Sequence, residues 1–189
     1  MLANSRFTIL YFIHCTHRGG ITMSSLLALS VSIGGLGAVA TWLALVAGVP
    51  GMQIWGVFIG WGCYFASGAN TEALKGAICG HISGAVLAVV ALNLVGLLPI
   101  AGALNVPIWV GVTVAALVYA SQVAALANIP AAVYGYATTA GLFLLGGPVL
   151  QDVSSLSLGN PGVVAIISLI IGACFGAISG RLAGVLGSD

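Results

Sequence analysis

The stretch Gly76-Ala77-Ile78-Cys79-Gly80-His81-Ile82-Ser83-Gly84 returns almost letter for letter as Gly172-Ala173-Cys174-Phe175-Gly176-Ala177-Ile178-Ser179-Gly180. Each copy repeats glycine every four residues, so on a helix the glycines form a groove along one face. A glycine inside a soluble helix costs roughly 0.5–1 kcal/mol relative to alanine. A repeated row therefore indicates that close helix packing offsets this cost. We predict such packing at Gly76, Gly80, Gly84, Gly172, Gly176, Gly180 and Gly184.

The composition indicates the environment in which this packing occurs. The chain is 60% hydrophobic and 4% charged, with a mean hydropathy of +1.20, whereas soluble domains carry about 25% charged residues. Residues 23–71, 76–151 and 153–180 contain no charged side chain, and each run exceeds the ~20 residues that cross a ~30 Å hydrocarbon core. We therefore predict an all-α polytopic membrane protein. The net charge of +1 gives no indication of nucleic-acid binding.

Turn residues divide the chain into six predicted transmembrane helices. Breakers such as Gly48-Val49-Pro50-Gly51 and Gly146-Gly147-Pro148 separate the apolar segments. Glu72 and Lys75 lie three residues apart at the mouth of the third span, where they can pair. Residues 23–189 thus form one membrane domain, whose spans we expect at about 24–47, 52–66, 76–98, 106–126, 130–145 and 163–186.

Residues 1–22 differ from the rest of the chain. Their apolar piece, residues 7–13, is too short to span and has no convincing cleavage site, so we predict an interfacial or disordered extension. An upstream start ahead of a true start at Met23 is a second interpretation. The cluster His14-Cys15-x-His17 is a weak metal signal because it has no partner cluster. We predict no metal site.

The basic residues predict the orientation. With six spans, Arg6, Arg18, Lys75 and Arg181 all fall on one face of the membrane. By the positive-inside rule this face is cytoplasmic. Both termini are then cytoplasmic, and the loop at Asp152 is external.

The repeated stretch also predicts the symmetry. Three spans in each repeat, about 23–100 and 101–187, make the second copy enter the membrane from the opposite side, which is the inverted arrangement found in many transporters. The segment at 47–50 resembles that at 127–130, and the Gly60 segment resembles the Gly135 segment. Chance similarity between glycine-rich apolar segments is the alternative.

Several of these residues also resemble a known family. Trp55-Gly56-Val57-Phe58-Ile59-Gly60, Tyr64-Phe65-Ala66, Leu74-Lys75-Gly76, the spacing of Pro130, Gly135 and Thr139, and Gly172 with Phe175-Gly176 are similar to the YcdZ-like small bacterial inner-membrane proteins. The resemblance covers roughly residues 25–187, with departures at Ala140 and Gly141. It implies a bacterial inner-membrane location and supports six spans. The family has no known function, so it implies no activity.

Catalytic chemistry is not indicated. No carboxylate lies inside a predicted span, and no Ser/His/Asp set is evident. The cysteines, Cys15, Cys63, Cys79 and Cys174, form no CxxC pair and imply no structural disulfide. We predict no enzyme and no cofactor.

His81 is the one strongly polar ionisable side chain well inside a predicted span. Such residues tend to face a bundle interior or a watery cavity, where a histidine can gate or relay a proton. The alternative is a neutral histidine hydrogen-bonded to a nearby backbone or hydroxyl group. Its counterpart in the repeat is Ala177.

Aromatic and hydroxyl side chains could line a solute path with His81. Tyr64 and Thr139 each follow a glycine by four residues, Gly60 and Gly135, which places hydroxyl and glycine on one helix face. These side chains could instead be core residues or interface anchors. The predicted path consists of Trp61, Tyr64, Phe65, His81, Tyr134, Tyr136, Thr138 and Thr139.

Two functions follow from these patterns. The first is a channel or facilitator for a small neutral or weakly charged solute, because inverted repeats, scarce charge and hydroxyl-bearing helices suit a narrow path. The second is a structural or regulatory membrane subunit whose glycines serve only packing. The lack of ionic residues argues against a strongly ion-coupled pump. The partners expected are the lipid bilayer, a small solute and a second copy of the chain.

Overall fold

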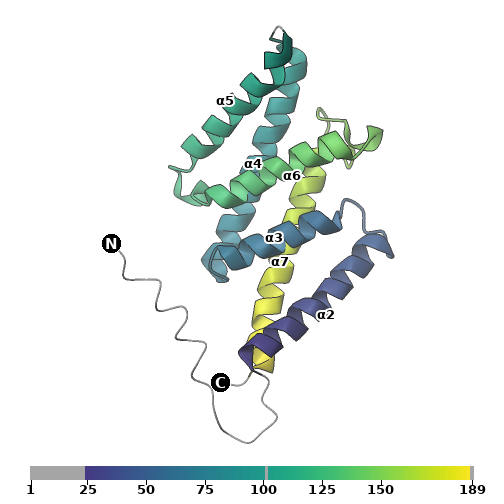
Figure 1. The fold of residues 1–189 in the computed structure, drawn as a ribbon, viewed down its shortest axis with the longest axis vertical. Coiled ribbons are helices and arrows are strands. Elements are labelled where there is room, and N and C mark those ends of the chain that lie inside the picture. Colours follow the sequence, from purple (N-terminus) through teal and green to yellow (C-terminus); the bar gives the residue numbers. More distant parts are fainter. Residues whose placement is uncertain (1–23, 101, 188–189) are drawn as a thin grey trace, which may run out of the picture.

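The computed structural model describes residues 24–100 and 102–187, and this part of the chain is all-helical, as predicted. The predictions for residues 1–22 lie outside the described residues. Short 3₁₀ turns at 102–104, 124–126 and 148–150 join longer helices. The six α-helices are α2 (Ser25–Leu45), α3 (Ile54–Ala66), α4 (Thr71–Leu97), α5 (Asn105–Ala120), α6 (Ile129–Leu145) and α7 (Pro161–Leu186) (Figure 1).

Polar caps set the starts of four helices. Ser24, Asn70, Asn128 and Asn160 each accept a hydrogen bond from a backbone N–H in the first turn that follows, which satisfies a donor that the helix itself leaves unpaired. The Asn70 cap makes α4 begin at Thr71 instead of residue 76. Helix α4 therefore includes Glu72 and Lys75, whose side chains pair at 3.0 Å as predicted.

Helix α5 is shorter than predicted. The apolar pattern predicted a span to residue 126, but the helix ends at Ala120. The N–H groups of Ser121, Gln122 and Val123 each bond to the carbonyl three residues earlier, so the helix tightens into turns. The 3₁₀ turn Ala124–Leu126 then leads to the Asn128 cap.

In the described part of the chain, four helical segments are long and apolar enough to cross a bilayer: α2, α4, α7, and α5 with its preceding 3₁₀ turn. Helix α6 is shorter, and the 13 residues of α3 extend only about 20 Å at 1.5 Å per residue. These lengths fit a multi-pass membrane protein. The six-span arrangement stays a prediction.

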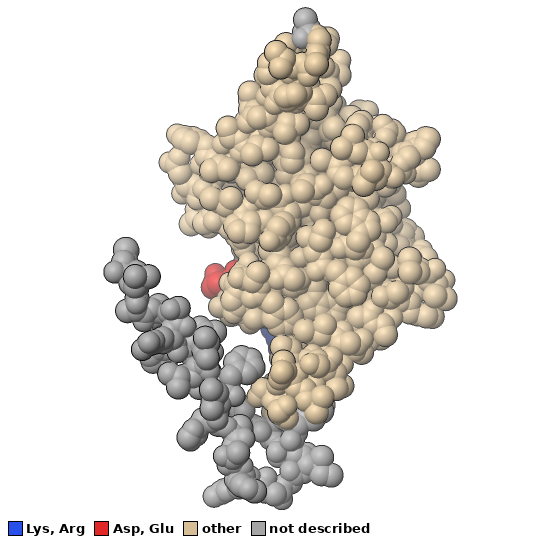
Figure 2. All heavy atoms as spheres, viewed as in Figure 1, with Lys and Arg blue, Asp and Glu red and all other residues tan. Residues whose placement is uncertain are grey.

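The two long helices α4 and α7 form the scaffold, and the short helices α3 and α6 cross them (Figure 1). Helix α4 packs mainly against α6, and α7 packs mainly against α3. Helix α5 lies beside α4, and α2 lies beside α7. In the space-filling view, nearly all of the described surface on this face is uncharged (Figure 2), as suits a surface in contact with lipid.

Glycines make both crossings possible. A Cβ atom on Gly84 of α4 would lie 1.8 Å from the carbonyl oxygen of Ala132 in α6. A Cβ atom on Gly172 of α7 would lie 1.9 Å from the carbonyl oxygen of Val57 in α3. Both distances are far inside van der Waals contact, so each helix pair approaches backbone to backbone.

The short helices contribute the reciprocal glycines. A Cβ atom on Gly135 of α6 would lie 2.2 Å from the carbonyl oxygen of His81 in α4, and one on Gly60 of α3 would lie 2.1 Å from that of Leu169 in α7. The α4–α6 crossing and the α7–α3 crossing therefore use corresponding contacts. His81 and Leu169 occupy equivalent places in them.

The surroundings of the remaining predicted packing glycines become looser with distance from Gly84 and Gly172 along each row. A Cβ atom on Gly80 would lie 2.6 Å from Ala131 Cβ, and one on Gly176 would lie 2.8 Å from the Tyr64 ring. The closest atoms to such a Cβ at Gly76 and Gly180 lie at 3.6 and 3.9 Å, and Gly184 has no neighbour within 4 Å. The tight contacts thus occupy the C-terminal end of the first row and the N-terminal end of the second row.

The two rows also differ in register. The repeated stretch aligns Gly84 with Gly180, but the contact of Gly84 corresponds to that of Gly172, eight residues earlier. The glycine that makes the tight contact is the one at which the short helix crosses the long helix. Sequence similarity between the two long helices does not determine the position of this crossing.

The loop after α6 is organised around Asp152. The Ser155 hydroxyl donates to its carboxylate, as do the backbone N–H groups of Ser154 and Ser155 and the Ser154 hydroxyl. These hydrogen bonds, that of the Ser155 side chain foremost, lower the pKa of Asp152 to about 2. The loop therefore keeps its negative charge across the physiological pH range.

Candidate functional site

Two cavities lie between the short helices α3 and α6, and we call them together the α3–α6 crevice. The first has a volume of about 430 Å³ and the second about 380 Å³. Tyr134 of α6 lines both cavities, and its side chain is partly exposed. The crevice therefore reaches the two ends of α3, with Tyr134 between the two cavities.

The first cavity is mainly apolar, with one polar group that has no partner. Trp55, Ile59 and Thr138 contribute to its wall. Thr138 is 2% exposed, and its hydroxyl makes no hydrogen bond within the described residues. A buried hydroxyl without a partner costs roughly 1–3 kcal/mol. A bound solute or water that paired with Thr138 would recover this energy.

The second cavity is more polar. Asn128 Nδ2 donates to Ser67 Oγ at 2.9 Å, while Asn128 Oδ1 caps α6 through the Ala131 N–H. Both Asn128 and Ser67 line the cavity together with Cys63. Hydrogen-bonding groups are therefore present at this end of the crevice.

His81 lies outside the crevice, at the α4–α6 crossing. It is fully buried, and its Nδ1 lies 3.0 Å from the carbonyl oxygen of Ala131. Because a carbonyl group only accepts, Nδ1 carries the hydrogen, and in a neutral ring Nε2 is then the acceptor. Nε2 has no partner among the described residues. This arrangement matches the hydrogen bond to a nearby backbone group that the second interpretation of His81 expects.

Trp61 and Thr139 also lie outside the cavities. Trp61 Nε1 donates to Ser179 Oγ at 3.0 Å, which ties α3 to α7. The Thr139 hydroxyl donates to the carbonyl oxygen of Gly135 in its own helix at 2.9 Å. Both side chains are buried, so their polar groups serve helix structure and packing.

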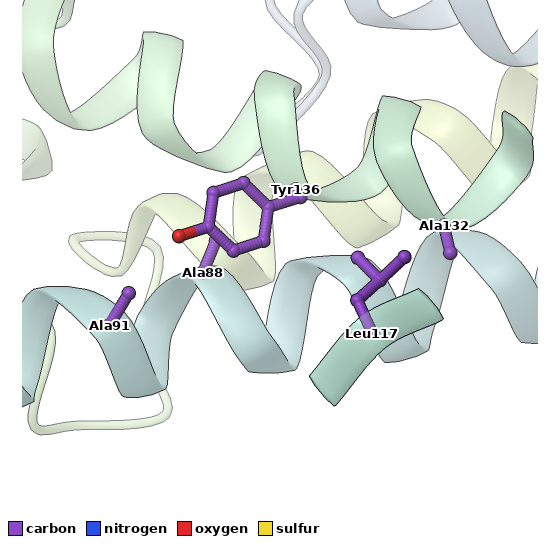
Figure 3. Packing of buried hydrophobic residues seen from close by; sticks show 5 residues of the cluster. All are labelled: Ala88, Ala91, Leu117, Ala132 and Tyr136. Atoms are coloured by element: carbon purple, nitrogen blue, oxygen red, sulfur yellow. The ribbon is translucent and has the colours of Figure 1, made fainter. Parts of the chain in front are cut away.

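Tyr136 belongs to the core where α4, α5 and α6 meet (Figure 3). Its hydroxyl lies 2.9 Å from that of Thr113, which joins α6 to α5. The ring packs in a cluster with Ala88, Ala91, Leu117 and Ala132 (Figure 3). Tyr136 is thus a core residue.

Tyr64 and Phe65 line a third cavity, of about 510 Å³, beside Arg181. The eight side chains of the predicted path are therefore distributed over several places. Only Tyr134 and Thr138 of the eight line the α3–α6 crevice.

Some crevice residues were absent from the predicted set. Trp55 and Gly141 line the first cavity, and Ser67 and Asn128 line the second. Ser67 and Asn128 lie in turns next to apolar helices. A polar residue at such a place in the sequence could have indicated a polar group beside a cavity. Within residues 24–100 and 102–187, no group of His, Cys, Asp and Glu side chains could hold a metal ion.

Comparison with known proteins places the chain in a family. No curated protein and no solved structure matches it. A family model described as a protein of unknown function, DUF1097, matches residues 30–184. This match covers most of the sequence, and the chain therefore belongs to the DUF1097 family of proteins of unknown function.

Proposed function

We propose that the protein is a channel or facilitator for a small neutral or weakly charged solute, and that the α3–α6 crevice is its solute path. The observation that carries the proposal is the pair of cavities that share Tyr134. The unpartnered hydroxyl of Thr138 in the first cavity and the polar pair Asn128 and Ser67 in the second support it.

The chemistry of the crevice suits a neutral solute. Narrow pores select without charge when wall groups replace part of the solute's hydration shell. Hydroxyl and amide groups can do this, and no charged side chain lines either cavity. A strongly hydrated ion would find no compensating charge in the crevice.

We further propose a six-span architecture built as two inverted three-helix repeats in a bacterial inner membrane, with both termini cytoplasmic. Support comes from the corresponding contacts of Gly84 and Gly172, and of Gly135 and Gly60. The resemblance to the YcdZ-like proteins supports the location. Because α3 and α6 are short, their flanking loops would complete the crossing.

A structural or regulatory membrane subunit without transport is the second candidate function. It is favoured by the polar groups of Trp61, Tyr136 and Thr139, which bond within the protein. In both cases we propose a non-enzymatic protein without a cofactor. Its partners would be lipid, a small solute and, in an oligomer, a second copy.

Swelling of proteoliposomes in a panel of small neutral solutes tests the proposal. We expect the wild type to admit at least one solute faster than protein-free liposomes do. Tyr134→Phe and Thr138→Val should each change this flux by roughly two- to tenfold, because each removes one hydrogen-bonding group worth about 0.5–1.5 kcal/mol. Thr41→Val is the matched control, since the Thr41 hydroxyl bonds to the Gly37 carbonyl within α2.

Two results would exclude the solute path. One is a wild-type flux no higher than that of protein-free liposomes. The other is an equal flux in the wild type, Tyr134→Phe and Thr138→Val. The first result leaves the structural or regulatory subunit as the function, and the second moves the solute path away from the crevice.

Cysteine labelling tests the proposed orientation. In a variant without its native cysteines, we expect Thr71→Cys and Leu156→Cys to react with a membrane-impermeant maleimide from opposite sides. Both side chains are exposed, and Leu156 lies in the Asp152 loop. Labelling of both positions from the same side would contradict the proposed topology.

A further inference from the structure

The third cavity lies where four helices approach one another near Arg181. It has a volume of about 510 Å³ and is lined by Leu29 of α2, Tyr64 of α3, Thr71 of α4 and Arg181 of α7. This set differs from the α3–α6 crevice in containing a cationic side chain. No carboxylate lines the cavity.

Arg181 is a cation without a partner in the described part of the chain. The only other cation there, Lys75, is paired with Glu72 at 3.0 Å. Arg181 has no ion pair with a described residue. Its guanidinium group has five N–H donors in a planar fork and accepts nothing. This geometry fits two oxygens of a carboxylate or phosphate group.

Tyr64 contributes a second unused donor. The side chain is only 5% exposed, and its hydroxyl has no hydrogen-bond partner among the described residues. The hydroxyl lies 4.0 Å from the position that a Cβ atom on Gly180 would take, and Gly180 also lines the cavity. Within the described residues, the buried polar atoms without a partner are His81 Nε2 and Thr138 Oγ1, so the Tyr64 hydroxyl is accessible from the cavity and can donate to a ligand there.

The start of α4 adds to the positive potential of the cavity. Asn70 and Thr71 line it, and Asn70 Oδ1 caps the helix through the Ala73 N–H at 2.8 Å. The first N–H groups of a helix favour a nearby anion, and the effect falls off within one turn. Glu72 lies in the same turn, but its carboxylate is engaged by Lys75.

We propose that this cavity binds an oxyanion, either a carboxylate or a phosphate group, held by the Arg181 guanidinium and the Tyr64 hydroxyl. The side chains of Leu29, Phe65 and Leu74 form apolar walls, so the ligand can carry a hydrocarbon portion. The same chemistry belongs to the headgroup of an anionic lipid and to a free organic or inorganic anion.

Calorimetric titration of the purified full chain in non-ionic detergent tests the site, with inorganic phosphate, acetate and phosphatidylglycerol as probes and phosphatidylcholine as the zwitterionic control. We expect Arg181→Gln to weaken binding at least about tenfold, because it removes hydrogen bonds from a charged donor. Tyr64→Phe should weaken binding about threefold, because it removes one hydrogen bond from a neutral donor. The double variant Glu72→Gln, Lys75→Gln is the matched control, because it removes the ion pair outside the cavity without changing the net charge and should leave the affinity unchanged.

The probes distinguish the source of the oxyanion. Loss of phosphate or acetate binding in Arg181→Gln assigns a free anion. Binding of phosphatidylglycerol alone, lost in the same variant, assigns a lipid headgroup. If Arg181→Gln gives too little folded protein, Arg181→Lys should still weaken binding, because it keeps the charge but loses the planar fork.

Two results would overturn the proposal. The first is an equal affinity of the wild type and Arg181→Gln for every probe, which includes the case in which neither protein binds. Where Arg181→Lys replaces Arg181→Gln, the same comparison is made with that variant. The second is an equal loss of binding in the double variant Glu72→Gln, Lys75→Gln and in Arg181→Gln, since the loss would then not depend on the cavity. Binding is measured without flux, so either result leaves the proposed channel untouched.

Discussion

Alanine at Gly84 or at Gly172 is expected to abolish the folded protein, although alanine is the better helix former. The added methyl group would lie 1.8 Å from the Ala132 carbonyl oxygen in the first case and 1.9 Å from that of Val57 in the second. The obstructing atoms belong to backbone, so no side-chain rotation relieves the clash. Overpacking typically costs 1–3 kcal/mol and occasionally more, and we expect at least about 3 kcal/mol because a whole helix must move.

Folded yield and the melting temperature in detergent measure this effect. Gly35→Ala and Gly111→Ala are matched controls, because both glycines lie inside helices and have no neighbour within 4 Å. These two variants should match the wild type or gain up to about 1 kcal/mol of stability from helix propensity. Normal yield and melting temperature in both Gly84→Ala and Gly172→Ala would show that the helices do not cross at these glycines.

Ala137→Trp is expected to reduce solute flux at least about tenfold while the protein still folds. Ala137 lines the first cavity of the α3–α6 crevice and is exposed, so a larger side chain meets open space. An indole group would occupy a substantial part of the roughly 430 Å³ and cover Thr138. A narrow path conducts poorly once its wall groups are covered.

Ala115→Trp provides the control for this experiment. Ala115 is exposed on α5 and lines neither cavity of the crevice, so its replacement should leave the flux unchanged. Swelling of proteoliposomes that contain equal amounts of folded protein gives the comparison. Equal flux in Ala137→Trp and the wild type would move the solute path away from the crevice.

Much of the local structure could be predicted from sequence because its causes are local. Apolar runs and breakers such as Gly48 and Pro99 divide the chain into the six helices that the structure contains. The observed helix boundaries differ from the predicted ones where local hydrogen bonds, and not the apolar pattern, determine where a helix begins or ends. Asn70 starts α4 early, whereas at Ser121 the chain tightens into turns despite its apolar sequence.

The site was harder to predict because it depends on how helices cross. The spacing of Thr139 from Gly135 predicted a hydroxyl facing a path, but the same spacing lets the hydroxyl bond to its own helix. The proximity of Tyr64 and Arg181 arises from the α3–α7 crossing. Nothing in either local sequence signals this meeting.

The short helix α3 also implies an order of assembly during synthesis. A helix of 13 residues is too short to be held by the bilayer alone, so it depends on its glycine contact with a long helix. The ribosome makes α4 before α6, and α6 can dock as it emerges. Helix α3 ends at Ala66, but its partner α7 begins only at Pro161. The packing of α3 against α7 can therefore form only after the last helix has been translated, and truncation before α7 would remove the helix against which α3 mainly packs.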